Sequence, residues 1–125
     1  MVRTIPDAPR NLLSHAPNEI TTTPVTLETN RKYYVPDHTG LITLNMPATV
    51  DCEIGDYIEV ATFSEDHVAI IPVDTQSIES PWGGNTTTSW TSTSNLATTR
   101  LLYIGTYGGT PVWLTMGGIG NWAFG

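Results

Sequence analysis

Apolar and polar residues alternate with a period of two over much of the chain after residue 24, which is the spacing of a strand with one buried face. In the segment "LITLNMP", the apolar residues Ile42, Leu44 and Met46 fall on one face. In the segment "YIEVATF", the same alternation places Ile58 and Val60 on one face. These five side chains are therefore predicted to point into a core.

The other strand candidates are short and are separated by turn residues. They are the segments "VTLE", "RKYYV", "VAIIPV", "QSIES", "RLLYIGTY", "PVWLTM" and "GNWAF". Residues 80–99 are predicted to form a long loop that contains one more possible strand around Trp90. The four residues "SEDH" between "YIEVATF" and "VAIIPV" predict a hairpin. Because no segment has the helical period, the chain is predicted to be all-β, a small antiparallel β-sandwich or barrel.

Residues 1–24 have a different pattern, because four prolines interrupt any regular element. We therefore expect two parts, an extended N-terminal arm over residues 1–24 and a β domain over residues 25–125. The arm has two open interpretations, a disordered terminus or a segment that becomes ordered on a partner. The candidate anchors for the second interpretation are Ile5, Leu12 and Leu13.

Composition narrows the possible partners. The formal net charge is −7 and the sequence pI is about 4.6. Nucleic-acid binding requires a basic surface, and an anionic membrane surface would repel this chain, so neither partner is expected. A single cysteine cannot form an internal disulfide. With no long apolar run and no signal peptide at its start, the chain is expected to fold in a cytoplasm.

Charge is distributed unevenly along the chain. Residues 80–125 contain one charged residue, Arg100, together with all four tryptophans. An uncharged aromatic surface is typical of a subunit interface, and it also suits a face that stacks on sugar rings. Trp113, between two aliphatic residues, is predicted to lie in the core. The candidates for an interface or a glycan-facing surface are Trp82, Trp90, Tyr107 and Trp122.

The segment "CEIGDYIEV" brings the only cysteine, Cys52, close to several carboxylates. It lacks the ligand spacing of a zinc or calcium site, and Cys52 is expected to pack as a small apolar residue. Asp56 is expected to be a turn residue. The two acid–histidine pairs, 37–38 and 66–67, also fall in predicted turns. No catalytic, cofactor-binding or metal-binding residue is therefore predicted, and the chain is expected not to be an enzyme. A small hydrolase is the least supported alternative.

The series of strands and turns over residues 33–122 resembles modules of tailed-bacteriophage virion proteins, mostly fibres and tail spikes. The shared pattern is a strand ending in proline, a "GD.I.V" step, an "I.I" strand, a Thr/Ser/Asn loop and a closing strand with Trp before a Gly-rich end. The matching positions are Thr43, Leu44, Met46, Pro47, Gly55, Asp56, Ile58, Val60, Ile70, Tyr103, Trp113, Gly120 and Trp122. Met46 stands where leucine is commoner. The resemblance implies a non-enzymatic β module that is commonly homotrimeric, and it carries over no catalytic or receptor-binding residue.

Together these features predict a non-enzymatic virion structural protein made in the host cytoplasm. It would be a small homotrimer that contacts other virion proteins of the capsid, tail or neck through the N-terminal arm. Both a capsid decoration or cement protein and a short fibre fit this description. The alternative is a fibre tip that binds a cell-surface glycan of the host.

Overall fold

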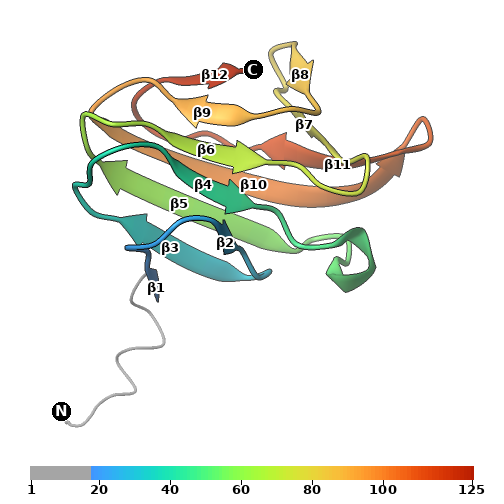
Figure 1. Cartoon of the computed structure of the whole chain (residues 1–125). Helices are drawn as coiled ribbons and strands as arrows, with labels where there is room; N and C mark the ends of the chain where they lie inside the picture. The colour runs from blue at the N-terminus through green and yellow to red at the C-terminus, as the bar shows by residue number, and fades with distance from the viewer. Residues whose placement is uncertain (1–17) are drawn as a thin grey trace, which may run out of the picture.

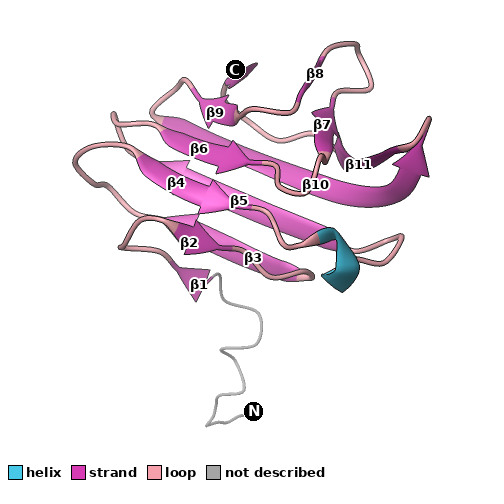
Figure 2. Cartoon of the chain, turned by 45° about the vertical axis from the view of Figure 1, so that its right-hand side comes forward, coloured by secondary structure: helices cyan, strands magenta, loops and turns pink. Residues whose placement is uncertain are grey.

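The structure is a computed structural model that describes residues 18–125, and these residues form two β-sheets packed face to face (Figure 1). A short 3-10 helix, η2 (Thr49–Asp51), follows the fourth strand (Figure 2). The strands are β1 (Asn18–Glu19), β2 (Val25–Thr26), β3 (Arg31–Val35), β4 (Ile42–Asn45), β5 (Tyr57–Phe63), β6 (Val68–Ile71), β7 (Ser77–Glu79), β8 (Asn85–Thr86), β9 (Trp90–Ser92), β10 (Leu96–Tyr107), β11 (Thr110–Thr115) and β12 (Trp122–Phe124).

One sheet has seven strands in the order β1-β3-β5-β10-β11-β7-β8, and the other has five in the order β12-β9-β6-β4-β2. The predicted all-β class is confirmed, and two separate sheets are consistent with the sandwich rather than the barrel. The predicted segments "RKYYV" and "YIEVATF" coincide with β3 and β5. The predicted strand at Trp90 is β9, although the expected long loop around it also contains β8.

The prediction of antiparallel sheets is wrong, because both sheets are mixed. From β1 to β7 each strand lies in the sheet opposite the strand before it. Strands that alternate in this way return to their own sheet with the same direction, so β1, β3 and β5 are parallel neighbours, as are β2, β4 and β6. The first half of the domain is therefore a flattened coil. The long strand β10 then pairs antiparallel with β5 and ends the coil.

The hairpin predicted at "SEDH" is also wrong, because β5 and β6 belong to different sheets. Both edges of β5 are occupied, by β3 and β10, so β6 pairs with β4 and β9 instead. The "SEDH" corner stacks on the earlier "PDHTG" corner. The Gly40 amide donates to the Asp66 carboxylate at 2.6 Å, and the Ser64 hydroxyl donates to the His38 carbonyl at 3.2 Å. These contacts hold successive turns of the coil in register.

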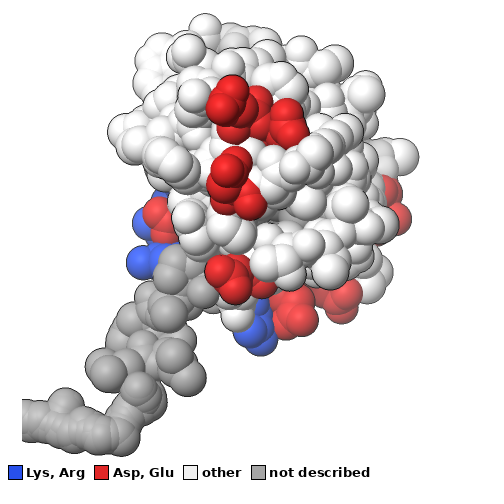
Figure 3. All heavy atoms as spheres, turned by 60° about the vertical axis from the view of Figure 1, so that its left-hand side comes forward, with Lys and Arg blue, Asp and Glu red and all other residues white. Residues whose placement is uncertain are grey.

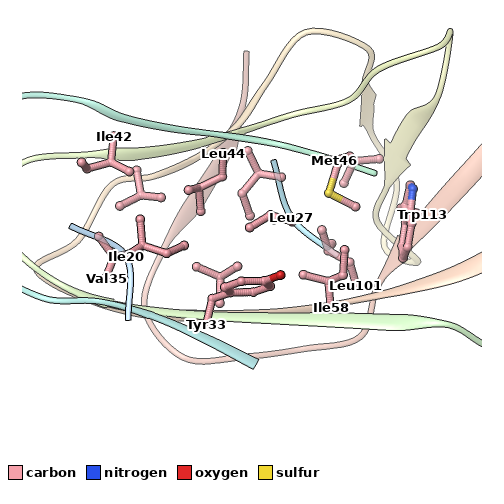
Figure 4. Packing of buried hydrophobic residues seen from close by; sticks show 14 of the residues in the cluster. Ile20, Leu27, Tyr33, Val35, Ile42, Leu44, Met46, Ile58, Leu101 and Trp113 are labelled. Atoms are coloured by element: carbon pink, nitrogen blue, oxygen red, sulfur yellow. The ribbon is translucent and has the colours of Figure 1, made fainter. Parts of the chain in front are cut away.

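The core lies between the two sheets and is built from the alternating positions that the sequence indicated (Figure 4). Ile42, Leu44 and Met46 enter it from one layer, and Ile58 and Val60 enter it from the other. Trp113 of β11 is fully buried, as predicted. The ring of Tyr103 lies against it with a centroid distance of 5.1 Å. Apolar burial of this kind is the main stabilising contribution to folding.

Residues 18–24 belong to the β domain, although the sequence pattern assigned them to the arm. Strand β1 pairs in parallel with β3, and Ile20 is buried in the core. Thr23 accepts a hydrogen bond from the amide of Thr43 at 2.8 Å. The boundary predicted at residue 24 is therefore too late. The rest of the predicted arm, with Ile5, Leu12 and Leu13, lies outside the described residues.

Replacing Leu44 with alanine is expected to lower the free energy of unfolding by about 3 kcal/mol, because it opens a cavity between the sheets. Leu44 is 0% exposed, whereas Leu41, which precedes β4, is 55% exposed. Leu41→Ala is the matched control and should change the free energy of unfolding by less than about 0.5 kcal/mol. Urea denaturation of both variants measures the difference, and equal losses would contradict the assignment of the core.

Candidate functional site

An uncharged aromatic pocket, named the aromatic pocket below, opens where β9 and β12 of the five-stranded sheet meet β10 of the seven-stranded sheet. Its volume is about 280 Å³, near the lower end of the range for small-molecule sites. It combines three indole rings with threonine hydroxyls, one amide and a glycine-rich backbone. The lining residues are Ser80, Trp82, Trp90, Thr98, Thr99, Thr115, Gly117, Gly118, Gly120, Asn121 and Trp122.

A pair of stacked indoles forms one part of the aromatic pocket. Trp90 and Trp122 lie on adjacent antiparallel strands, with ring centroids 6.0 Å apart and planes inclined by 13°. Phe124, directly opposite Trp90 in the register of β12, packs against it at 4.6 Å. All three rings pack against the edge of the hydrophobic core. The strand pairing thus gathers aromatic residues that are far apart in the sequence.

Both indole N–H groups are used to fix these rings to the opposite sheet. Trp90 Nε1 donates to Thr99 Oγ1 at 3.1 Å, and Trp122 Nε1 donates to the Thr98 carbonyl at 3.0 Å. Both acceptors lie on β10, so each indole bridges the two layers of the sandwich. Because the donors already have partners, Trp90 and Trp122 can offer a ligand only the faces and edges of their rings.

The glycine-rich segment after β11 forms another wall of the aromatic pocket. The amide of Thr98 donates to the Ile119 carbonyl at 2.8 Å, so this segment runs directly along β10. A Cβ atom at Gly118 would collide with the carbonyl of Thr98, and one at Gly120 would collide with the carbonyl of Leu96. Only glycine permits this approach. The Gly-rich end of the sequence is therefore a requirement of the pocket wall.

Trp82 stands at the rim of the aromatic pocket. It is 82% exposed, and its amide donates to the Ser80 hydroxyl at 3.1 Å in the turn between β7 and β8. An indole this exposed contributes little to the core, so its large apolar face is available to a ligand. The polar groups nearby are the hydroxyl of Thr115 and the amide of Asn121, both of which can donate and accept hydrogen bonds.

Among the residues that the structure describes, the pocket lining carries no charged side chain. Arg100, the one charged residue after Glu79, neighbours the lining residue Thr99 but belongs to the outer face of its sheet. Its guanidinium lies 4.8 Å from the centre of the Tyr57 ring, a cation–π distance. On the face drawn in Figure 3, acidic side chains reach the upper third of the molecule, and only the surface above them shows no Lys, Arg, Asp or Glu.

The structure brings together three of the four aromatic residues that the sequence proposed for an interface or a glycan-facing surface. Trp82, Trp90 and Trp122 all line the aromatic pocket. Tyr107, 75% exposed, lies at the end of β10 and is not among the lining residues. Thr115 and Asn121 were not among the predicted site residues, because their contribution depends on how the segment after β11 folds back along β10.

The acidic segment "CEIGDYIEV" forms a turn rather than a reactive centre. Asp56 accepts hydrogen bonds from the amide of Glu53 at 2.8 Å and from the side-chain amide of Asn30 at 3.0 Å. Its role as a turn residue is thus confirmed. The carboxylate of Glu59 approaches the Lys32 ammonium at 3.9 Å on the outer face of the sheet. These carboxylates are therefore engaged in local structure.

Cys52 packs against the core and its thiol donates a hydrogen bond to the Ala48 carbonyl at 3.4 Å. Its sequence neighbours Val50 and Ile54 are exposed, so the turn directs only the cysteine inward. Burial, together with the carboxylates of Asp56, Asp51 and Asp74, raises the pKa of the thiol to about 11. A nucleophilic cysteine needs the opposite shift.

The two acid–histidine pairs lie at corners of the coil, where both histidine rings contact backbone carbonyls. His38 Nδ1 lies 2.9 Å from the Pro36 carbonyl, and His67 Nδ1 lies 2.6 Å from the Ser92 carbonyl. Within residues 18–125, no group of three His, Cys, Asp or Glu side chains is placed to hold a metal ion. The same part of the chain has no helix long and apolar enough to cross a membrane.

No protein-family model matches the chain, and none of the curated proteins has a matching sequence. The resemblance to bacteriophage virion modules therefore stays a prediction.

Cys52 is expected to react slowly with iodoacetamide at neutral pH, because a pKa of about 11 leaves little thiolate. The thiolate fraction should rise as the pH increases from 7 to 10 without reaching a plateau, whereas an ordinary thiol with a pKa of about 8.5 levels off within that range. Mass spectrometry of the alkylated chain gives the rate, with glutathione as the reference thiol. A plateau by pH 10 would contradict the raised pKa.

Proposed function

We propose that this chain is a non-enzymatic structural protein of a bacteriophage virion, assembled as a homotrimer. Residues 1–17 attach the trimer to other virion proteins of the capsid, tail or neck. Two roles fit this proposal, a capsid decoration protein and a short fibre. The proposal rests on the sequence resemblance over residues 33–122 and on an apolar patch at the surface of the β domain.

The apolar patch lies on the outer face of the seven-stranded sheet. Phe63 and Leu96 are direct cross-strand partners in β5 and β10, and they are 57% and 48% exposed. Met116 and Ile119, in the segment that continues along the other edge of β10, are also about half exposed. Contact between subunits would remove this apolar surface from water. The observation that carries the structural role is therefore the exposed Phe63–Leu96 pair.

Light scattering of the purified chain is expected to give three times the monomer mass of 13.6 kDa. Phe63→Glu should shift the mass toward the monomer, because it places a charge in the proposed contact. Asp37→Asn, in an exposed turn residue, is the control and should leave the mass unchanged. A monomeric wild-type chain would contradict the trimer.

Deletion of residues 1–17 is expected to abolish binding to virus particles while leaving the oligomer intact. The deletion ends before β1, so it preserves the pairing of β1 with β3 and the burial of Ile20. Cosedimentation with particles that lack the protein measures attachment. Normal binding by the shortened chain would rule out attachment through these residues.

A second candidate role, recognition of carbohydrate on the host surface, is favoured by the aromatic pocket. Sugar rings have C–H faces that stack on indoles, and their hydroxyl groups exchange hydrogen bonds with hydroxyl, amide and backbone groups. The pocket supplies both kinds of partner, through Trp82, Trp90 and Trp122 and through Thr115 and Asn121. A partly preformed pocket of this composition is typical of small-ligand recognition.

Trp82→Ala is expected to weaken binding to host cells or to a glycan array roughly five- to tenfold, because it removes one stacking face. Trp82 is exposed at the rim, so its replacement should leave the melting temperature unchanged. Tyr107→Ala removes an equally exposed aromatic ring outside the pocket and serves as the matched control. Equal binding by both variants and the wild-type chain would rule out recognition through Trp82 at the aromatic pocket.

A further inference from the structure

We propose that the aromatic pocket selects a neutral sugar unit and rejects one that carries a carboxylate. This inference rests on the proposed carbohydrate-binding role and specifies the class of ligand. It follows from three properties of the pocket, which are its uncharged lining, the fixed roles of its indole donors and the negative charge of the rest of the chain.

Within residues 18–125, the lining offers no cation to an anionic ligand. Arg100 is the nearest basic residue in the sequence, and its guanidinium lies over the Tyr57 ring on the outer face of the sheet. Arg31 and Lys32 of β3 are paired with acidic side chains, which are Glu28 before β3 and Glu59 of the neighbouring strand β5. A carboxylate transferred from water into the aromatic pocket would lose hydration without gaining a charged partner, which is strongly unfavourable.

The hydrogen-bonding groups of the pocket suit hydroxyl groups. The hydroxyl of Thr98, a partly exposed residue of the lining, accepts from the amide of Ile119 at 2.9 Å, so its own proton can be donated to a ligand. Asn121 holds its loop through its backbone, with its amide donating to Ser94 and its carbonyl accepting from Thr93. Its side-chain amide is thus available as both donor and acceptor. Neutral hydroxyl groups need this mixed character, whereas a carboxylate needs only donors.

The size of the pocket and the position of Trp82 define how the sugar would be placed. A volume of about 280 Å³ suits a single sugar ring rather than a longer chain. The ring would lie against the Trp90–Trp122 pair, and the exposed indole of Trp82 would contact its outer side. The net charge of −7 adds a long-range repulsion that acts against acidic glycans before contact.

The test uses matched pairs of methyl glycosides that differ only at C6, the β-glucoside with the β-glucuronide and the β-galactoside with the β-galacturonide. Calorimetry with the full-length chain is expected to show at least one neutral glycoside binding roughly tenfold more tightly than its acidic partner. The difference should persist at 0.5 M salt, where long-range repulsion is screened, because it arises inside the pocket.

Two variants locate the selectivity. Asn121→Lys places a cation at the pocket edge without changing the backbone hydrogen bonds of residue 121, so it should raise affinity for the uronide severalfold. Trp82→Ala should weaken the neutral glycoside roughly five- to tenfold. A uronide that binds the wild-type chain as tightly as its neutral partner would overturn the selectivity and leave carbohydrate binding standing. Failure of every glycoside to bind would overturn both.

Discussion

The passage of the chain from one sheet to the other after nearly every strand is the constraint on which this domain depends. Because β1 to β7 alternate between the two layers, each strand must bury its inward side chains against strands that are neighbours in sequence but lie in the opposite sheet. The core is therefore assembled from successive segments of chain. Stacked corners, such as the contact between Gly40 and Asp66, keep successive turns of the coil aligned.

The same constraint creates the aromatic pocket at one end of the sandwich. The five-stranded sheet ends in β9 and β12, and the indoles of Trp90 and Trp122 reach from these strands to acceptors on β10. These two hydrogen bonds connect the two sheets in the part of the domain that follows the coil. They also hold both rings in the lining of the aromatic pocket, so the residues that close the domain also shape the site.

Local patterning was enough to predict most of the strands and much of the core. Ile42, Leu44, Ile58 and Val60 are buried as their alternation required, and Asp56 is a turn residue as its surroundings indicated. Strand direction could not be predicted, because a period of two is the same in a hairpin and in a crossover between sheets. "SEDH" therefore looked like a hairpin turn, although it carries the chain to the opposite layer.

The candidate site was predicted only in part for a similar reason. The clustering of tryptophans in an uncharged region indicated a recognition surface, and Trp82, Trp90 and Trp122 do lie together. Tyr107 does not join them, because the 12-residue strand β10 carries it toward the opposite end of the sandwich. Thr115 and Asn121 carry no local signal, since their position depends on long-range pairing along β10.

The most direct test is a titration of the ¹⁵N-labelled chain with a neutral methyl glycoside, followed through the indole N–H signals of its four tryptophans. Trp113, fully buried in the core and absent from the pocket lining, provides an internal reference. Saturable shifts of Trp82, Trp90 and Trp122 with an unchanged Trp113 signal are the predicted result. Unchanged signals at all four indoles would contradict carbohydrate binding at the aromatic pocket.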